Sequence, residues 1–236
     1  MLEELKERVC RANQALVEEG LVIQTWGNVS GVDRQAGMVV IKPSGIAYDG
    51  MGPKHMVVLS LEDGRVVEGE LRPSSDTPTH LVLYRELSGL GGIVHTHSLY
   101  ATAWSQARRP IPPLGTTHAD YYYGSVPCTR CMSDQEVAGP YEINTGKVIV
   151  ERFADLDTHA FPGVLVAGHG PFAWGDSPEQ AVESAVVLEH IAHLAAVTCQ
   201  IVPAPSSVSQ ALLDRHYLRK HGPNAYYGQQ PPKASV

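Results

Sequence analysis

Apolar residues at the start of the chain recur at helical spacing. They are predicted to share one face of an amphipathic helix: Leu2, Leu5, Val9, Ala12 and Leu16. Gly20 is placed to end this helix, because glycine readily adopts the left-handed conformation found at helix ends. Further helices are predicted directly after Ser98, which is expected to cap its helix, and over residues 77–87, 178–201 and 212–220.

Short apolar runs between turn residues predict the strands. They cover residues 38–42, 57–61, 66–67, 92–97, 163–168 and 171–174. Because strands and helices are interspersed and several strands are joined by short turns, a mixed or antiparallel sheet with helices packed on it is favoured over a parallel one. With no linker or repeat in the sequence, residues 1–229 are predicted to form one domain and residues 230–236 a disordered tail.

Composition narrows the class of protein. The chain has 236 residues, of which 43% are hydrophobic and 18% charged, which is enough to build a core. A net charge of −7 argues against non-specific binding to nucleic acid or to an anionic membrane, since both need a basic surface. The charged N-terminal segment does not resemble a signal peptide, and four cysteines do not make a disulfide framework, so a cytoplasmic location is expected.

Three histidines are the strongest chemical signal. His95 and His97 alternate along a predicted strand, so their rings project from the same face. His169 follows another apolar strand and lies between two glycines. If the two strands end at one sheet edge, the three imidazoles match the ligand count of an open catalytic zinc site, although a histidine that only satisfies turn backbone remains the alternative for His169.

Three turns are rich in hydrogen-bond donors. Residues 72–78 place two serines and free backbone amides before a helix, which favours an anion. Asp76 in this segment is either a helix cap or a fourth metal ligand. Residues 25–31 and 41–45 are glycine-containing turns, the second with Lys42, and neither has the spacing of a nucleotide-binding loop.

Taken in order, these motifs resemble one family. TWGNVSG, IKPSG, PSSDTPTH, VHTHS, AGHGPF and NAYYGQ are similar to the class II aldolase/epimerase family, over nearly the whole chain. More narrowly, they resemble the members that interconvert L-ribulose 5-phosphate and D-xylulose 5-phosphate. The resemblance implies an α/β fold of three layers, α/β/α, around a central, mainly antiparallel sheet. It also implies a homotetramer with active sites between subunits.

The resemblance assigns roles to particular residues. The implied ligands of a divalent metal, Zn²⁺ in the first place with Mn²⁺ or Co²⁺ as alternatives, are Asp76, His95, His97 and His169. The implied contacts to the substrate phosphate are Gly27, Asn28, Lys42, Ser44, Gly45, Ser74 and Ser75. Asp120 and Tyr227 are the implied acid/base pair, with the tyrosine supplied by a neighbouring subunit.

The implied reaction is a retro-aldol cleavage followed by re-addition. Carbon 4 is not next to the carbonyl, so its hydrogen is not acidic enough for direct exchange; breaking the bond to carbon 3 leaves an enediolate that a divalent metal stabilises. Two alternatives stay open. One is an aldolase of the same family that acts on L-fuculose 1-phosphate, where glutamate stands in place of Asp76. The other is a non-catalytic scaffold like the adducin head, which lacks the metal ligands. Arabinose and ascorbate breakdown both fit the implied substrate.

Overall fold

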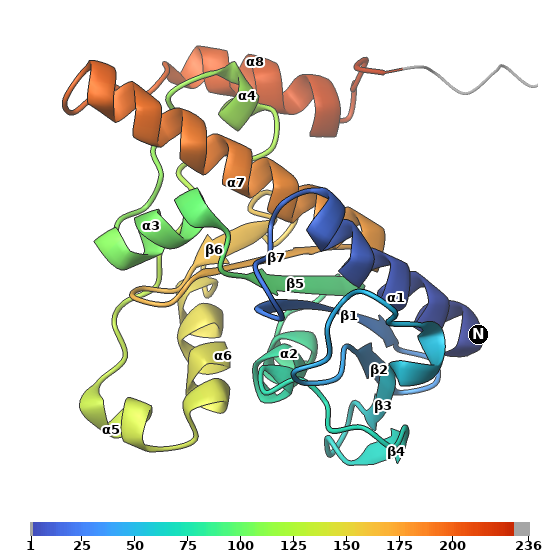
Figure 1. Ribbon diagram of the computed structural model, residues 1–236. Helices are drawn as coiled ribbons and strands as arrows, with labels where there is room; N and C mark the ends of the chain where they lie inside the picture. Colours follow the sequence, from blue (N-terminus) through green and yellow to red (C-terminus); the bar gives the residue numbers. More distant parts are fainter. Residues whose placement is uncertain (1, 229–236) are drawn as a thin grey trace, which may run out of the picture.

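The centre of the molecule is a seven-stranded sheet in the order β4-β3-β2-β1-β5-β7-β6, and every neighbouring pair is antiparallel. The computed structural model describes residues 2–228 (Figure 1). The strands are β1 (Gly27–Asp33), β2 (Met38–Ile41), β3 (Val57–Ser60), β4 (Val66–Glu68), β5 (Gly92–Thr96), β6 (Gly163–Leu165) and β7 (Pro171–Gly175). The prediction of a mainly antiparallel sheet is confirmed.

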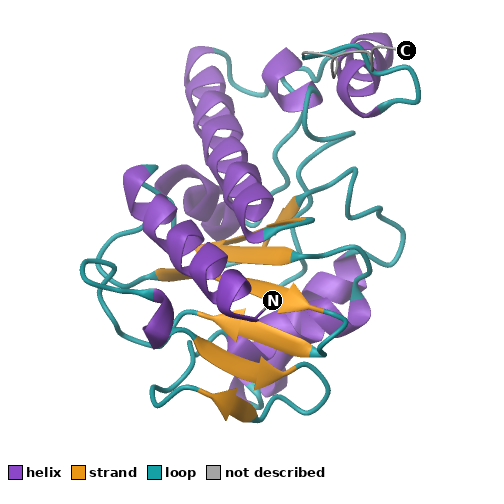
Figure 2. Ribbon diagram, turned by 90° about the vertical axis from the view of Figure 1, so that its right-hand side faces the viewer, coloured by secondary structure: helices purple, strands orange, loops and turns teal. Residues whose placement is uncertain are grey.

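Helices cover both faces of the sheet (Figures 1 and 2). They are α1 (Leu2–Glu18), the 3-10 turn η1 (Pro53–His55), α2 (Thr77–Glu86), α3 (Leu99–Ala107), α4 (Thr116–Ala119), α5 (Asp134–Ala138), α6 (Tyr141–Arg152), α7 (Pro178–Ile201) and α8 (Gln210–His221). In Figure 1, α1 and α7 lie above the sheet and α2 and α6 below it. This gives the three layers that were expected.

The two faces of the sheet carry separate hydrophobic cores because side chains alternate along each strand. Ile93 of β5 packs with α2 and α6, in a cluster that includes Phe172 and Trp174. The next residue, Val94, packs on the other face with Leu16 of α1. Each core therefore fixes the orientation of β5, the strand that leads to the predicted histidines.

A glycine allows α1 to approach the sheet closely. A Cβ atom at Gly31 of β1 would lie 2.8 Å from Leu5 and 2.9 Å from Val9. Any other side chain at this position would push the helix away, so the glycine is required by packing.

Two parts of the fold differ from the predictions. Residues 25–31 were expected to be a turn, but β1 begins within them at Gly27 and lies in the middle of the sheet. Helices α4, α5 and α6 were not predicted. The predicted tail, residues 230–236, lies outside the described residues.

Helix α7 is the one helix in the described part of the chain that is long and apolar enough to cross a membrane, judged by length and composition. Ala181, Leu188 and Ala192 on this helix are buried in the hydrophobic clusters of the protein. Part of the apolar surface of α7 therefore belongs to the core, whereas Leu194, Val197 and Ile201 near its end are exposed.

Candidate active site

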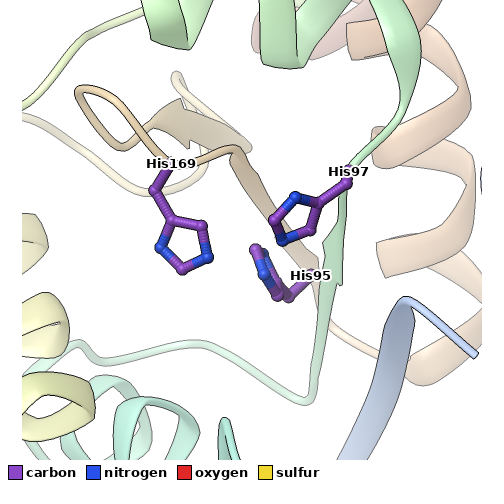
Figure 3. Close-up of side chains that lie close together, drawn as sticks. All are labelled: His95, His97 and His169. Atoms are coloured by element: carbon purple, nitrogen blue, oxygen red, sulfur yellow. The ribbon is translucent and has the colours of Figure 1, made fainter.

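Three imidazoles converge where two neighbouring strands meet. His95 lies in β5, His97 follows the end of that strand, and His169 lies in the turn between β6 and β7. Since β5 and β7 pair antiparallel, with His95 opposite Phe172, the end of one strand lies beside the start of the other. The potential ligand nitrogens of the three residues all lie within 4.8 Å of one another, and the rings face a common point (Figure 3).

Hydrogen bonds and burial prepare these rings for a cation. The Nδ1 atom of His95 lies 2.9 Å from the Pro171 carbonyl oxygen and donates to it, so its Nε2 atom keeps a free lone pair. Burial, with His95 and His97 nearby, lowers the pKa of His169 to about 4. This ring is therefore neutral at pH 7, as a metal ligand must be.

Asp76 occupies the N-cap position of α2, but its side chain does not cap the helix. Instead, its Oδ2 atom accepts a hydrogen bond of 2.7 Å from the Asn28 amide. Burial alone would raise the pKa of Asp76, but His95, His80 and the bond from Asn28 lower it overall, so the group is a carboxylate. Its oxygens are not within the 4.8 Å group formed by the three histidines.

A cavity of about 490 Å³ connects His95 and His97 to the donor-rich turns. It is lined by Thr25, Trp26, Gly27, Asn28, Lys42, Pro43, Ser44, Gly45, Ser74, Ser75, Asp76, His95 and His97. All seven residues predicted to contact substrate are among them. Two backbone bonds tie the turns together, from the Ser44 amide to the Arg72 carbonyl at 2.9 Å and from the Ser74 amide to the Lys42 carbonyl at 3.0 Å.

Lys42 places a positive charge on the wall of this cavity without a directly paired carboxylate among the described residues. The residue is 1% exposed, and its Nζ atom contacts the Pro43 carbonyl oxygen at 3.3 Å and the ring of Tyr48 at 4.8 Å. No carboxylate pairs with it among the described residues. Burial lowers its pKa to about 8. A buried cation without a partner is costly, and an anion in the cavity would supply the missing charge.

The predicted acid/base residues lie together, but outside this cavity. Asp120, at the end of α4, accepts hydrogen bonds from Arg219 at 2.7 Å and from His216 at 3.0 Å. The Tyr227 ring lies 5.0 Å from the Arg219 guanidinium and 4.5 Å from the Lys220 ammonium. Figure 1 shows α4 and α8 side by side, above α7 and away from the sheet. We call Asp120, Arg219, Lys220 and Tyr227 the α8 cluster.

Two residues that support the histidines were not predicted from the sequence. Both carboxylate oxygens of Glu189 on α7 accept hydrogen bonds from the start of α3, from Tyr100 at 2.8 Å and Ala101 at 2.9 Å. This carboxylate replaces the Ser98 side chain, which makes no capping bond. Tyr141 was also missed, and its hydroxyl lies 3.4 Å from Nδ1 of His169. No local sequence signal identifies either residue, since each acts across the fold.

Known proteins are similar to this chain over most of its length. Residues 7–196 match the family model described as class II aldolase and adducin N-terminal domain. The L-ribulose-5-phosphate 4-epimerase UlaF of Salmonella paratyphi B is 54% identical over 229 residues, which cover 97% of this chain and 100% of that relative. The same enzyme of Salmonella choleraesuis is also 54% identical, with the same coverage.

A solved structure agrees with the fold. An L-fuculose 1-phosphate aldolase superposes with a TM-score of 0.76 at 26% identity, covering 90% of this chain and 94% of that one. The family match and the 54% identical relatives each extend over far more than half of the chain. The chain belongs to the class II aldolase and adducin N-terminal domain family.

Proposed function

We propose that this chain is an L-ribulose-5-phosphate 4-epimerase, which interconverts L-ribulose 5-phosphate and D-xylulose 5-phosphate. The observation that carries the proposal is that one cavity joins His95 and His97, two members of the histidine cluster, to the Lys42 ammonium, which pairs with no carboxylate among the described residues. Relatives of that name are 54% identical along 97% of the chain. A sugar phosphate has the two chemical features that such a cavity selects, namely vicinal oxygens and a terminal phosphate.

The donor set fits a divalent cation. His95, His97 and His169 provide imidazole nitrogens, and the carboxylate of Asp76 lies on the wall of the cavity that His95 and His97 line. A nitrogen-rich set with one carboxylate suits Zn²⁺ best, while Mn²⁺ and Co²⁺ are also accommodated. When bound, such a cation supplies Lewis-acid stabilisation of negative charge that develops on the sugar oxygens.

The phosphate end of the cavity holds the substrate during the reaction. Lys42 and the hydroxyls of Ser44, Ser74 and Ser75 are the proposed phosphate donors, with the backbone around Gly27 and Gly45 close by. Breaking the bond between carbons 3 and 4 gives the enediolate of dihydroxyacetone and glycolaldehyde phosphate. Because its phosphate stays bound, the aldehyde can turn its other face without leaving, and re-addition then inverts carbon 4.

Proton transfer is assigned to Asp120 and Tyr227. One of them takes the proton of the carbon 4 hydroxyl as the bond breaks, and the other returns a proton to the oxygen of the aldehyde when the bond re-forms on the opposite face. Both residues lie in the α8 cluster, outside the cavity of their own chain. We therefore propose a homotetramer in the cytoplasm, in which the α8 cluster of one subunit completes the cavity of the next.

The test is the conversion of L-ribulose 5-phosphate to D-xylulose 5-phosphate by purified protein, with and without a chelator. We expect turnover that the chelator abolishes and that added Zn²⁺, Mn²⁺ or Co²⁺ restores. Release of dihydroxyacetone phosphate from L-fuculose 1-phosphate, without any conversion of the pentose, would instead identify an aldolase. Protein that contains no stoichiometric divalent ion and shows neither activity would fit a scaffold.

A further inference from the structure

Three polar side chains form a hydrogen-bonded chain inside the core, between the sheet and α2. The Ser30 hydroxyl of β1 lies 2.7 Å from Nδ1 of His80 and 2.8 Å from the Tyr84 hydroxyl. Ser30 and His80 are 0% exposed and Tyr84 is 1% exposed. Burying three polar groups in a hydrophobic layer gains little stability, so their presence points to another role.

The chain ends in an unpaired atom. Nε2 of His80 is buried and has no hydrogen-bond partner, whereas the Ser30 and Tyr84 hydroxyls are both satisfied. Burial lowers the pKa of His80 to about 3, so the ring is neutral and carries one hydrogen.

Counting hydrogens decides which nitrogen of His80 carries that hydrogen. If Tyr84 donates to Ser30 and Ser30 donates to Nδ1, only the Nε2–H group lacks a partner. If instead Nδ1–H donates to Ser30 and Ser30 donates to Tyr84, both the Tyr84 hydroxyl hydrogen and the Nε2 lone pair lack a hydrogen-bond partner. Since each unmatched buried polar group is destabilising, the order that leaves only one such group is favoured, and Nε2–H is a free donor.

This free donor lies beside the predicted metal ligands. Asp76 and His80 are four residues apart at the start of α2, the backbone amide of His80 bonds to the Asp76 carbonyl at 3.2 Å, and such positions share one helix face. Phe172 contacts His80 edge-on at 6.0 Å between ring centroids and stacks on His95 at 4.2 Å. Asn28 occupies one carboxylate oxygen of Asp76, and no described residue donates to the other.

We propose that His80 is a positioning residue for the metal site: its Nε2–H group donates to the free oxygen of the Asp76 carboxylate when a cation is bound. Tyr84 and Ser30 fix the tautomer that makes this donation available. Asn28 and His80 then hold the two carboxylate oxygens from two sides, as outer hydrogen bonds commonly orient ligands of metals. This inference rests on the metal site proposed above.

The test compares two substitutions of His80, each of which places a side-chain amide near one of the two ring nitrogens. His80→Gln places an amide donor near the position of Nε2, whereas His80→Asn places its amide near Nδ1 and leaves the Asp76 side empty. Metal affinity is measured by competition with a chromogenic chelator, and thermal unfolding of the metal-free proteins is recorded alongside. We expect His80→Asn to weaken metal binding about tenfold or more, and His80→Gln to stay within about threefold of the wild type.

A purely structural role gives a different pattern. Both variants would then lower the unfolding temperature of the metal-free protein and keep the metal affinity of the folded fraction, and that result overturns the proposal. Equal loss of affinity in both variants overturns it as well.

A second substitution decides the matter if either His80 variant does not fold. Ser30→Ala frees the His80 tautomer with a small change in volume and is expected to weaken metal binding about threefold or more, and unchanged affinity there refutes the inference. Wild-type protein that binds no divalent ion would refute the metal site itself, which is a distinguishable failure.

Discussion

The Lys42 ammonium combines a structural cost with a binding role. It is buried against Tyr48 and lacks a carboxylate partner among the described residues, and its pKa falls to about 8 because burial disfavours the charged form. In the unfolded chain the same group keeps its usual pKa near 10.5. Between these two values the unfolded state binds more protons, so the substrate-free protein becomes more stable as the pH rises from about 8.

Replacing Lys42 separates these two effects. Lys42→Met should raise KM for the sugar phosphate about tenfold or more, because a charge-assisted hydrogen bond is lost, while the free energy of unfolding of the substrate-free protein increases. Its metal content should not change, since Lys42 does not contact the histidines. Steady-state kinetics, urea denaturation and metal analysis measure the three quantities.

The pH profile provides the control for Lys42. In the wild type, kcat/KM should fall above pH about 8 as the ammonium loses its proton, and in Lys42→Met this fall should be absent. A wild-type profile that stays level well above that pH would contradict a role for the charged lysine in binding phosphate.

Individual residues differ in how far their roles could be predicted. The alternation of His95 and His97 and the glycines around His169 are local signals, and the structure brings these three side chains together. The hydrogen bond from Asn28 to Asp76 and the cap by Glu189 join residues that are distant in sequence. Those contacts form only when β1 meets the segment before α2 and when α7 packs on α3, so no spacing rule reveals them.

At the level of elements, α3 depends on a carboxylate from another helix. Its first amides donate to both oxygens of the half-buried Glu189 side chain, and α3 begins directly after His97 and Ser98. A carboxylate at this end also interacts favourably with the helix dipole. The cap therefore fixes the point where the chain leaves β5, and with it the position of His97.

Glu189→Ala should reduce the free energy of unfolding by about 1–2 kcal/mol, since both amides lose their acceptor. Glu189→Gln is the matched control, because one amide oxygen remains as an acceptor, and its loss should be smaller. Urea denaturation of the metal-free proteins measures both. If alanine and glutamine variants were as stable as the wild type, the carboxylate would not be an effective cap.

Strand β1 escaped prediction for a physical reason. The sequence of β1, GNVSGVD, contains glycine and polar residues that are typical of turns, yet it lies between β2 and β5 with Asn28 and Ser30 buried. The Asn28 amide nitrogen donates to Ser74 and Asp76, and the Ser30 hydroxyl bonds to His80 and Tyr84, all of which come from other segments. Strands with strong β-branched patterns, such as β2 and β3, were predicted nearly to the residue.

On the scale of the whole molecule, the proposed catalytic groups are divided between two regions. The cavity lies where β1, β2, β5 and the turn before α2 meet, and the α8 cluster lies beyond α7. Arg219, His216 and Lys220 surround the Asp120 carboxylate. Burial alone would raise the pKa of Asp120, but the hydrogen bonds from Arg219 and His216 lower it. The Asp120 carboxylate is thus held in a fixed position, as the acid/base role proposed for it requires.

Mixed tetramers test whether a site is shared. His97→Asn disables the cavity and Tyr227→Phe disables the α8 cluster, so each variant alone should lose most activity. Random mixing should restore about a quarter of the wild-type activity, because that fraction of sites combines an intact cavity with an intact neighbouring tyrosine.

A matched pair of cavity variants controls for this effect. Mixing His97→Asn with His95→Asn should restore nothing, since both changes disable the same part of every site. Failure of the first mixture to regain activity, in tetramers shown by mass spectrometry to contain both chains, would contradict sharing.

The separation of the cavity from the α8 cluster also bears on how such enzymes diversify. The histidines are held by a rigid sheet, whereas Asp120 and Tyr227 are presented by α4, α8 and the segment after α8. Mutations can accumulate in that outer region without disturbing the part of the fold that holds the three histidines. One ancestral fold could in this way acquire new substrates and new reactions through substitutions in the outer region. The two regions could then change in sequence at different rates.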